Sequence, residues 1–312
     1  MHFPKLLAAS VGLALTAGIP AWAGFTITPI FSAAIAGDTN SANIESTINS
    51  AIAVYQTRFT NPVNINITFD EMTSGLGQSQ YVYYPIPYAT YYAALAAHAT
   101  SSDDATALAH LSSGTNTNNP VTGTANIFVH AANIIALGIG NADNTQNLIK
   151  LNTSITNPGS TGTSGSYSLL SVTEHEIDEI LGLGSALDLT TPTDPFPEDL
   201  FRYDSSGARS FTTSTSAASF FSIDTSADLA QFNQTATGDT GDWASNPHPA
   251  GVPVQVQDAF ATPGAAPAPG VELTALDVIG YTNAITAPEP TPAVLLSGMG
   301  VVSFLLRRRR RA

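Results

Sequence analysis

The chain has 312 residues, with 24 acidic side chains, 10 basic side chains and no cysteine. The acidic excess makes nucleic acid and anionic lipid surfaces poor partners, because both would be repelled. The lack of cysteine excludes disulfides and thiolate metal sites, so any transition-metal site must use His, Asp or Glu.

Residues 1–23 have the layout of a secretory signal peptide. Lys5 precedes an apolar run from Leu6 to Ile19, and small residues surround Trp22 at Ala21 and Ala23. The apolar run is shorter than the roughly 20 residues that a membrane-spanning helix needs. We therefore expect a signal peptidase to cleave after Ala23 and the chain to be exported.

Alternating helical and strand patterns over residues 24–286 predict one α+β domain. Apolar residues recur at helical spacing over 42–59, which predicts a helix. Apolar and polar residues then alternate over 63–69, which predicts a strand. Residues 168–182 form the most informative helical segment. The further elements that we predict are helices at 90–99, 103–111 (with Ser101 or Ser102 as cap), 131–137 and 272–279, strands at 127–129 and 148–151, and a hairpin at 201–212.

The segment Glu174-His-Glu-Ile-Asp-Glu-Ile-Leu-Gly-Leu-Gly-Ser185 carries the chemistry. On a helix, His175 and Glu179 are four residues apart and share a face. Imidazole nitrogen and carboxylate oxygen are both zinc ligands. Glu176 lies beside them on the helix and is the candidate catalytic general base, which would take a proton from water made acidic by the metal.

Extended further, this segment resembles the metzincin signature His-Glu-x-x-His-x-x-Gly-x-x-His. Here Glu179 stands at the second ligand position, Gly182 at the glycine, and Ser185 at the third ligand position. The segments Asp199-Leu-Phe-Arg-Tyr203 and Leu276-Asp-Val-Ile-Gly-Tyr281 are similar to those of PEP-CTERM-bearing bacterial metalloproteases. The resemblance implies a zincin-like domain, in which a mixed sheet packs on a long N-terminal helix and an active-site helix.

The third ligand remains open at this point. Asp188 is the first candidate, because it follows the turn at Gly182, and Glu198 is the alternative. The remaining candidates are Asp194, Asp199 and His248. Zn²⁺ is the cofactor that we expect; Ca²⁺ is the alternative cation, since acidic oxygens surround the one histidine.

Residues 287–312 have three parts, which are Pro288-Glu-Pro290, an apolar stretch from Ala293 to Leu306, and Arg307 to Arg311. This arrangement resembles the PEP-CTERM sorting signal, which an exosortase-type enzyme recognises and removes. The arginines would stay on the cytoplasmic side, so the segment would anchor the chain transiently in the inner membrane. The final location implied is the cell envelope, the cell surface or the extracellular space.

Two functions follow from these patterns. The first is zinc-dependent hydrolysis of peptide bonds in a protein or peptide substrate outside the cytoplasm. The alternative is a non-catalytic extracellular matrix or exopolysaccharide-associated surface protein on a degenerate zincin scaffold. A bound metal ion distinguishes the two, because only the enzyme requires it.

Overall fold

The computed structural model describes residues 24–111, 117–158 and 164–284. It is an α+β fold, the class that the sequence predicts. The predicted signal peptide (1–23) and sorting signal (287–312) lie outside the described residues. Within the described ranges, no helix has the length and apolar character needed to cross a membrane.

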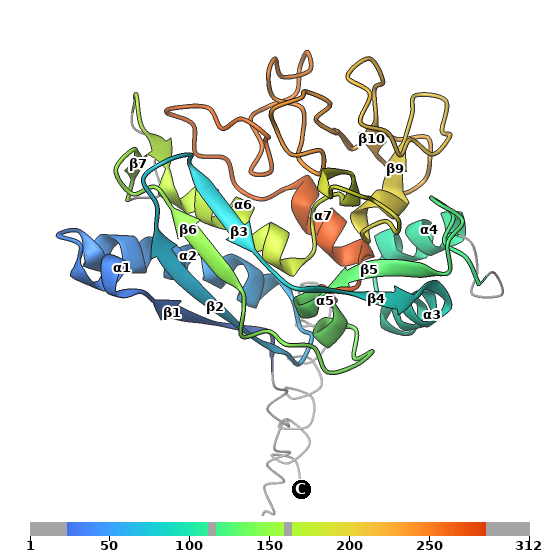
Figure 1. Ribbon diagram of the computed structural model, residues 1–312, viewed down its shortest axis with the longest axis horizontal. Helices are drawn as coiled ribbons and strands as arrows, with labels where there is room; N and C mark the ends of the chain where they lie inside the picture. The colour runs from blue at the N-terminus through green and yellow to red at the C-terminus, as the bar shows by residue number, and fades with distance from the viewer. Residues whose placement is uncertain (1–23, 112–116, 159–163, 285–312) are drawn as a thin grey trace, which may run out of the picture.

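The main sheet has four strands in the order β1-β2-β6-β3. β1 (Thr26–Phe31), β2 (Asn64–Glu71) and β6 (Leu148–Leu151) run parallel. β3 (Gly77–Gln80) pairs antiparallel with β6 and forms one edge (Figure 1). The sheet is therefore mixed, as predicted, although the sequence analysis did not identify β1 or β3.

Two long helices lie together behind this sheet (Figure 1). α2 (Ser41–Arg58) buries Ile44, Ile48 and Ile52, whose spacing places them on one face. α6 (Leu169–Leu181) packs against α2, β3 and β6. These two helices confirm the sequence predictions to within a residue or two at each end.

A second layer extends the fold beside the main sheet. β4 (Tyr83–Pro87), which the sequence analysis missed, pairs antiparallel with β5 (Asn126–His130). The side chain of Ser101 accepts a hydrogen bond from Asp104 N and so caps the helix that follows, as predicted. α3 (Tyr88–His98), α4 (Ser102–His110) and α5 (Ala131–Ala136) complete this layer. Beside the main sheet, α1 (Ala33–Gly37) contacts α2 and β2, and the short pair of β7 (Thr156–Asn157) and β8 (Tyr167–Ser168) lies next to α6.

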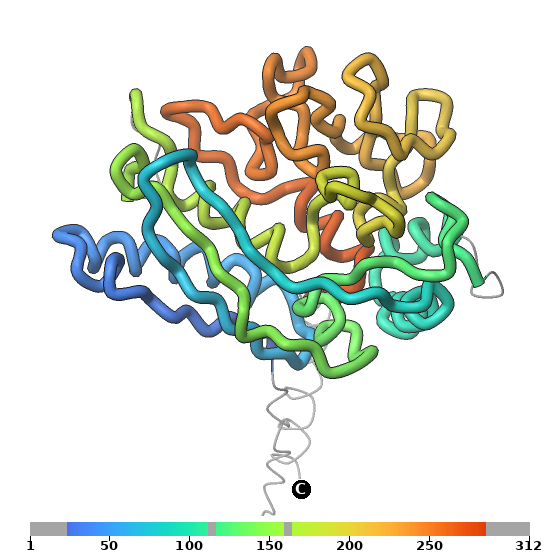
Figure 2. Tube along the Cα trace, in the orientation of Figure 1, coloured from blue at the N-terminus to red at the C-terminus, as the bar shows by residue number. Residues whose placement is uncertain are grey.

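Residues 186–270 contain little regular structure and lie over α6 (Figure 2). The predicted hairpin is present as a tight turn, with a bridge between Tyr203 and Arg209. The last helix is α7 (Val271–Val278), as predicted. The other short elements here are η1 (Ala186–Asp188), η2 (Glu198–Phe201), β9 (Arg202–Tyr203), β10 (Phe220–Phe221) and β11 (Ala230–Gln231).

The two ends of the described chain lie side by side. The rings of Phe25 and Tyr281 pack edge to face, with their centroids 5.8 Å apart. Thr60 N also donates to Thr282 O at 2.9 Å, which fixes the last described residues beside the end of α2.

Candidate metal centre

α6 presents His175 and Glu179 to a cavity. The helix begins where Ser168 Oγ accepts from Ser171 N, and it ends at Gly182, whose φ of +126° favours glycine. Its opposite face is buried in the core, so the two polar side chains face the other way. His175 Nε2 lies 3.6 Å from Glu179 Oε1, as the helical spacing predicts.

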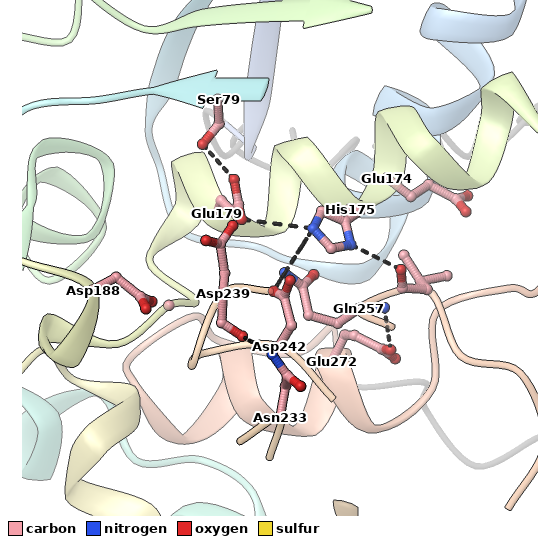
Figure 3. Close-up of polar contacts among 12 residues, drawn as sticks. Ser79, Glu174, His175, Glu179, Asp188, Asn233, Asp239, Asp242, Gln257 and Glu272 are labelled. Atoms are coloured by element: carbon pink, nitrogen blue, oxygen red, sulfur yellow. Dashed lines mark hydrogen bonds and ion pairs between the residues drawn. The ribbon is translucent and has the colours of Figure 1, made fainter. Parts of the chain in front are cut away.

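Asp242 completes a group of three donors. Its Oδ1 lies 3.7 Å from His175 Nε2, and one ligand atom from each of the three residues falls within 4.8 Å of the others (Figure 3). Four donors placed tetrahedrally at about 2.1 Å from zinc would be about 3.4 Å apart. The two spacings from His175, 3.6 Å and 3.7 Å, are close to that value, so small side-chain movements would bring the three donors around an ion.

Each of the three donors is oriented by a neighbouring polar group. His175 Nδ1 lies 3.0 Å from Val256 O, which leaves Nε2 facing the group. Ser79 Oγ on β3 donates to Glu179 Oε2, and Gln257 Nε2 donates to Asp242 Oδ1 at 2.9 Å. Outer contacts of this kind fix ligand orientation in metal sites.

The three donors carry complementary charge. Burial lowers the pKa of His175, but the carboxylates of Asp242 and Glu179 outweigh it and raise that pKa well above its usual value. Burial raises the pKa of Glu179, but hydrogen bonding and charge from His175 outweigh it, and the net shift is downward. The two carboxylates therefore favour positive charge at this position, which a bound cation would supply in place of the proton on His175.

Glu176, the predicted general base, lies against β3 at the wall of the same cavity. It is 5% exposed, and a Cβ on Gly77 would overlap its carboxylate, so only glycine fits opposite it. Burial, followed by the charge of Glu179, raises the pKa of Glu176 well above its usual value. Its carboxylate therefore holds a proton more tightly than an ordinary glutamate.

Asp188, the first candidate for the third ligand, lines the cavity but is not in the group of three donors. Both of its oxygens lie 3.0 Å from Thr240 N, so it holds the loop that carries Asp242. Glu198, the alternative, is buried and accepts from Gly184 N at 2.6 Å. Neither residue lies where His175 and Glu179 converge.

The other candidate ligands have structural partners. Asp199 accepts from Ala186 N and Phe196 N, each at 2.9 Å, and also from Ser185 Oγ. Ser185, at the third ligand position of the metzincin-like pattern, is thus part of a turn. Asp194 accepts from Thr124 Oγ1, and His248 Nε2 lies 2.7 Å from Asp258 Oδ2.

The cavity in front of these residues has a volume of about 810 Å³. It is bounded by β3, by α6 and by the segment 254–267. Its acidic lining side chains are Glu176, Glu179, Asp188, Asp239, Asp242 and Asp258.

The chain matches no model of a known protein family, no curated protein and no solved structure.

Proposed function

We propose that this protein is a zinc-dependent metallopeptidase that hydrolyses peptide bonds outside the cytoplasm. The observation that supports it most strongly is the convergence of His175, Glu179 and Asp242 at a large cavity. Catalytic zinc sites typically use three protein ligands and keep one position open. The cavity offers that open side to a substrate.

The donor chemistry favours zinc over calcium. Calcium takes six to eight oxygen ligands, whereas this group includes an imidazole nitrogen from His175. Zinc accepts nitrogen and carboxylate oxygen at about 2.0–2.2 Å. His175, Glu179 and Asp242 would hold the ion.

Glu176 would carry the proton in the reaction. A bound zinc ion supplies Lewis acidity, which polarises a peptide carbonyl and makes water acidic. Glu176 accepts the proton of the attacking water and passes it to the departing amine, so that one residue acts first as base and then as acid. Its position one residue from His175, at the wall of the cavity, suits this role.

The position of β3 at the edge of the sheet is the observation that favours a peptide as the substrate. β3 pairs with β6 on one side, and residues 76–81 line the cavity. An edge strand has free N–H and C=O groups that can pair with an extended peptide. We infer that a substrate strand lies along β3 and presents its scissile bond above α6.

The zincin-like architecture and the export route belong to the same proposal. The mixed sheet that packs on α2 and α6 supports the zincin-like architecture. The signal-peptide pattern at 1–23 and the PEP-CTERM-like pattern at 287–312 support action in the cell envelope, at the cell surface or beyond it.

The test is a comparison of wild type with Glu176→Gln. We expect wild type to cleave a general protein substrate, to lose that activity with a chelator, and to regain it with Zn²⁺. The variant should bind zinc like wild type and lose cleavage by at least about a hundredfold. Full activity in the variant would rule out this mechanism. Wild-type protein that neither binds zinc nor cleaves the substrate would favour the non-catalytic surface protein instead.

A further inference from the structure

The side chain of Gln257 is fully buried beside the three donors. Its Nε2 lies 2.9 Å from Asp242 Oδ1 and 3.4 Å from His175 Nε2 (Figure 3). These two atoms are the ones that would bind an ion. The amide therefore borders the position that the cation would take.

The orientation of this amide is unusual for a buried group. Within the described residues, Gln257 Oε1 has no hydrogen-bond partner, although burying an unpaired carbonyl oxygen is costly. The amide nitrogen, which can only donate, faces Asp242 Oδ1 and His175 Nε2. A cation bound to those two atoms would repel the amide hydrogens and attract the carbonyl oxygen.

We propose that Gln257 is a fourth protein ligand of a five-coordinate metal centre, whose remaining position stays open toward the cavity, and that its amide turns over when the ion binds so that Oε1 replaces Nε2 beside Asp242. This inference rests on the proposed zinc site. The two ends of a primary amide are nearly equal in size, so the turn needs no repacking of the core. It would give the unpaired oxygen a strong partner.

The backbone around Gln257 is held independently of the side chain. Its N donates to Glu272 Oε1 at 3.0 Å, and its O accepts from Trp243 N at 2.8 Å. The preceding residue, Val256, provides the carbonyl beside His175 Nδ1. One short segment thus orients two ligands and brings a fourth oxygen within reach.

A ligand role and a purely positioning role predict opposite effects of Gln257→Glu. An ionised glutamate supplies an oxygen ligand, but it cannot donate to Asp242 and would repel its carboxylate. If Gln257 binds the ion, Gln257→Glu should bind Zn²⁺ at least as tightly as wild type. If Gln257 only positions Asp242, the same variant should bind more weakly than Gln257→Leu.

The experiment measures Zn²⁺ affinity by competition with a chelating dye. We expect Gln257→Leu to lose at least about tenfold in affinity and Gln257→Glu to retain or exceed the wild-type value. Gln255→Leu is the matched control, because Gln255 lines the same cavity two residues away, and it should bind like wild type. Wild-type affinity in Gln257→Leu, or weaker binding by Gln257→Glu than by Gln257→Leu, overturns the inference.

A crystal structure of the zinc-loaded wild-type protein tests the same point without any substitution. The inference requires a side-chain atom of Gln257 at about 2.0–2.2 Å from the ion. An ion held by His175, Glu179 and Asp242 with the Gln257 amide more than about 3 Å away would overturn this inference and leave the proposed function standing. A wild-type protein that binds no zinc would overturn both.

Discussion

Gly241 packs directly against Gly184, so closely that a Cβ on Gly241 would overlap the backbone of Gly184 and Ser185. This contact joins the loop that follows α6 to the loop that carries Asp242. The third donor of the metal centre therefore depends on a close approach that any larger residue would prevent.

The variant Gly241→Ala should accordingly lose both stability and zinc binding. The added methyl group forces the two loops apart, and overpacking of this kind costs about 1–3 kcal/mol. Thermal unfolding and Zn²⁺ titration would measure the two effects. Gly37→Ala is the control, since a Cβ there meets nothing within 4 Å and the residue does not line the cavity. Unchanged zinc affinity in Gly241→Ala would show that the contact does not position Asp242.

Substitution of Asp242 should be far more damaging to zinc binding than substitution of Asp188. Asp242→Asn removes a charged ligand, and we expect zinc affinity to fall by about a hundredfold or more. Asp188→Asn retains an oxygen that can accept from Thr240 N, so it should bind zinc within a few-fold of wild type. The reverse order of affinities would restore Asp188 as the third ligand.

The hydroxyl of Ser79 should contribute to the site through Glu179. Ser79→Ala leaves Glu179 Oε2 without this donor, and the loss of such outer contacts lowers metal affinity by about 10–100-fold. Ser74→Ala, on the exposed rim of the same cavity, should have no effect. Equal zinc affinities for the two variants would contradict a role for β3 in orienting the ligand.

Much of the scaffold follows from local sequence. α2 and α6 have apolar residues at helical spacing, and β2 alternates apolar and polar side chains, so periodicity identifies all three. β3 reads Gly-Gln-Ser-Gln and has no apolar residue; it is a strand because it pairs with β6. The small residue Gly77 is required there because Glu176 lies against it.

Only two of the three donors of the candidate site can be predicted from local sequence. His175 and Glu179 belong to one helical turn, which fixes their distance. Asp242 comes from an irregular loop far along the chain, and its approach depends on tertiary packing at Gly241 and Trp243. Trp243 is fully buried and donates through Nε1 to Glu272 Oε1 at 3.1 Å. The only features of the local sequence that set Asp242 apart from other loop aspartates are Gly241 before it and Trp243 after it.

A pH effect on stability should come from Asp277, which is buried on α7 and does not line the cavity. Burial raises its pKa to about 6, against the opposing hydrogen bond from Ser101 Oγ at 2.6 Å, and the charge of Asp104 adds to the rise. An unfolded aspartate titrates near 3.9, so the folded state binds this proton more tightly. Stability is therefore lost as pH rises from about 4 to about 6.

Asp277→Asn should remove this contribution, because asparagine does not titrate yet can still accept from Ser101. Melting temperatures of wild type and variant, measured at about pH 4 and pH 7, would test it. We expect the variant to gain stability relative to wild type as pH rises. A melting-temperature difference that is the same at both pH values would contradict the raised pKa.

The most direct measurement for the central claim is the zinc content of the purified protein after equilibrium dialysis against Zn²⁺, beside a Glu179→Ala variant treated identically. The account predicts about one zinc ion per wild-type chain and a large loss in the variant. Wild-type protein that retains no zinc, or a variant that retains as much as wild type, would contradict the convergence of His175, Glu179 and Asp242 on a metal ion.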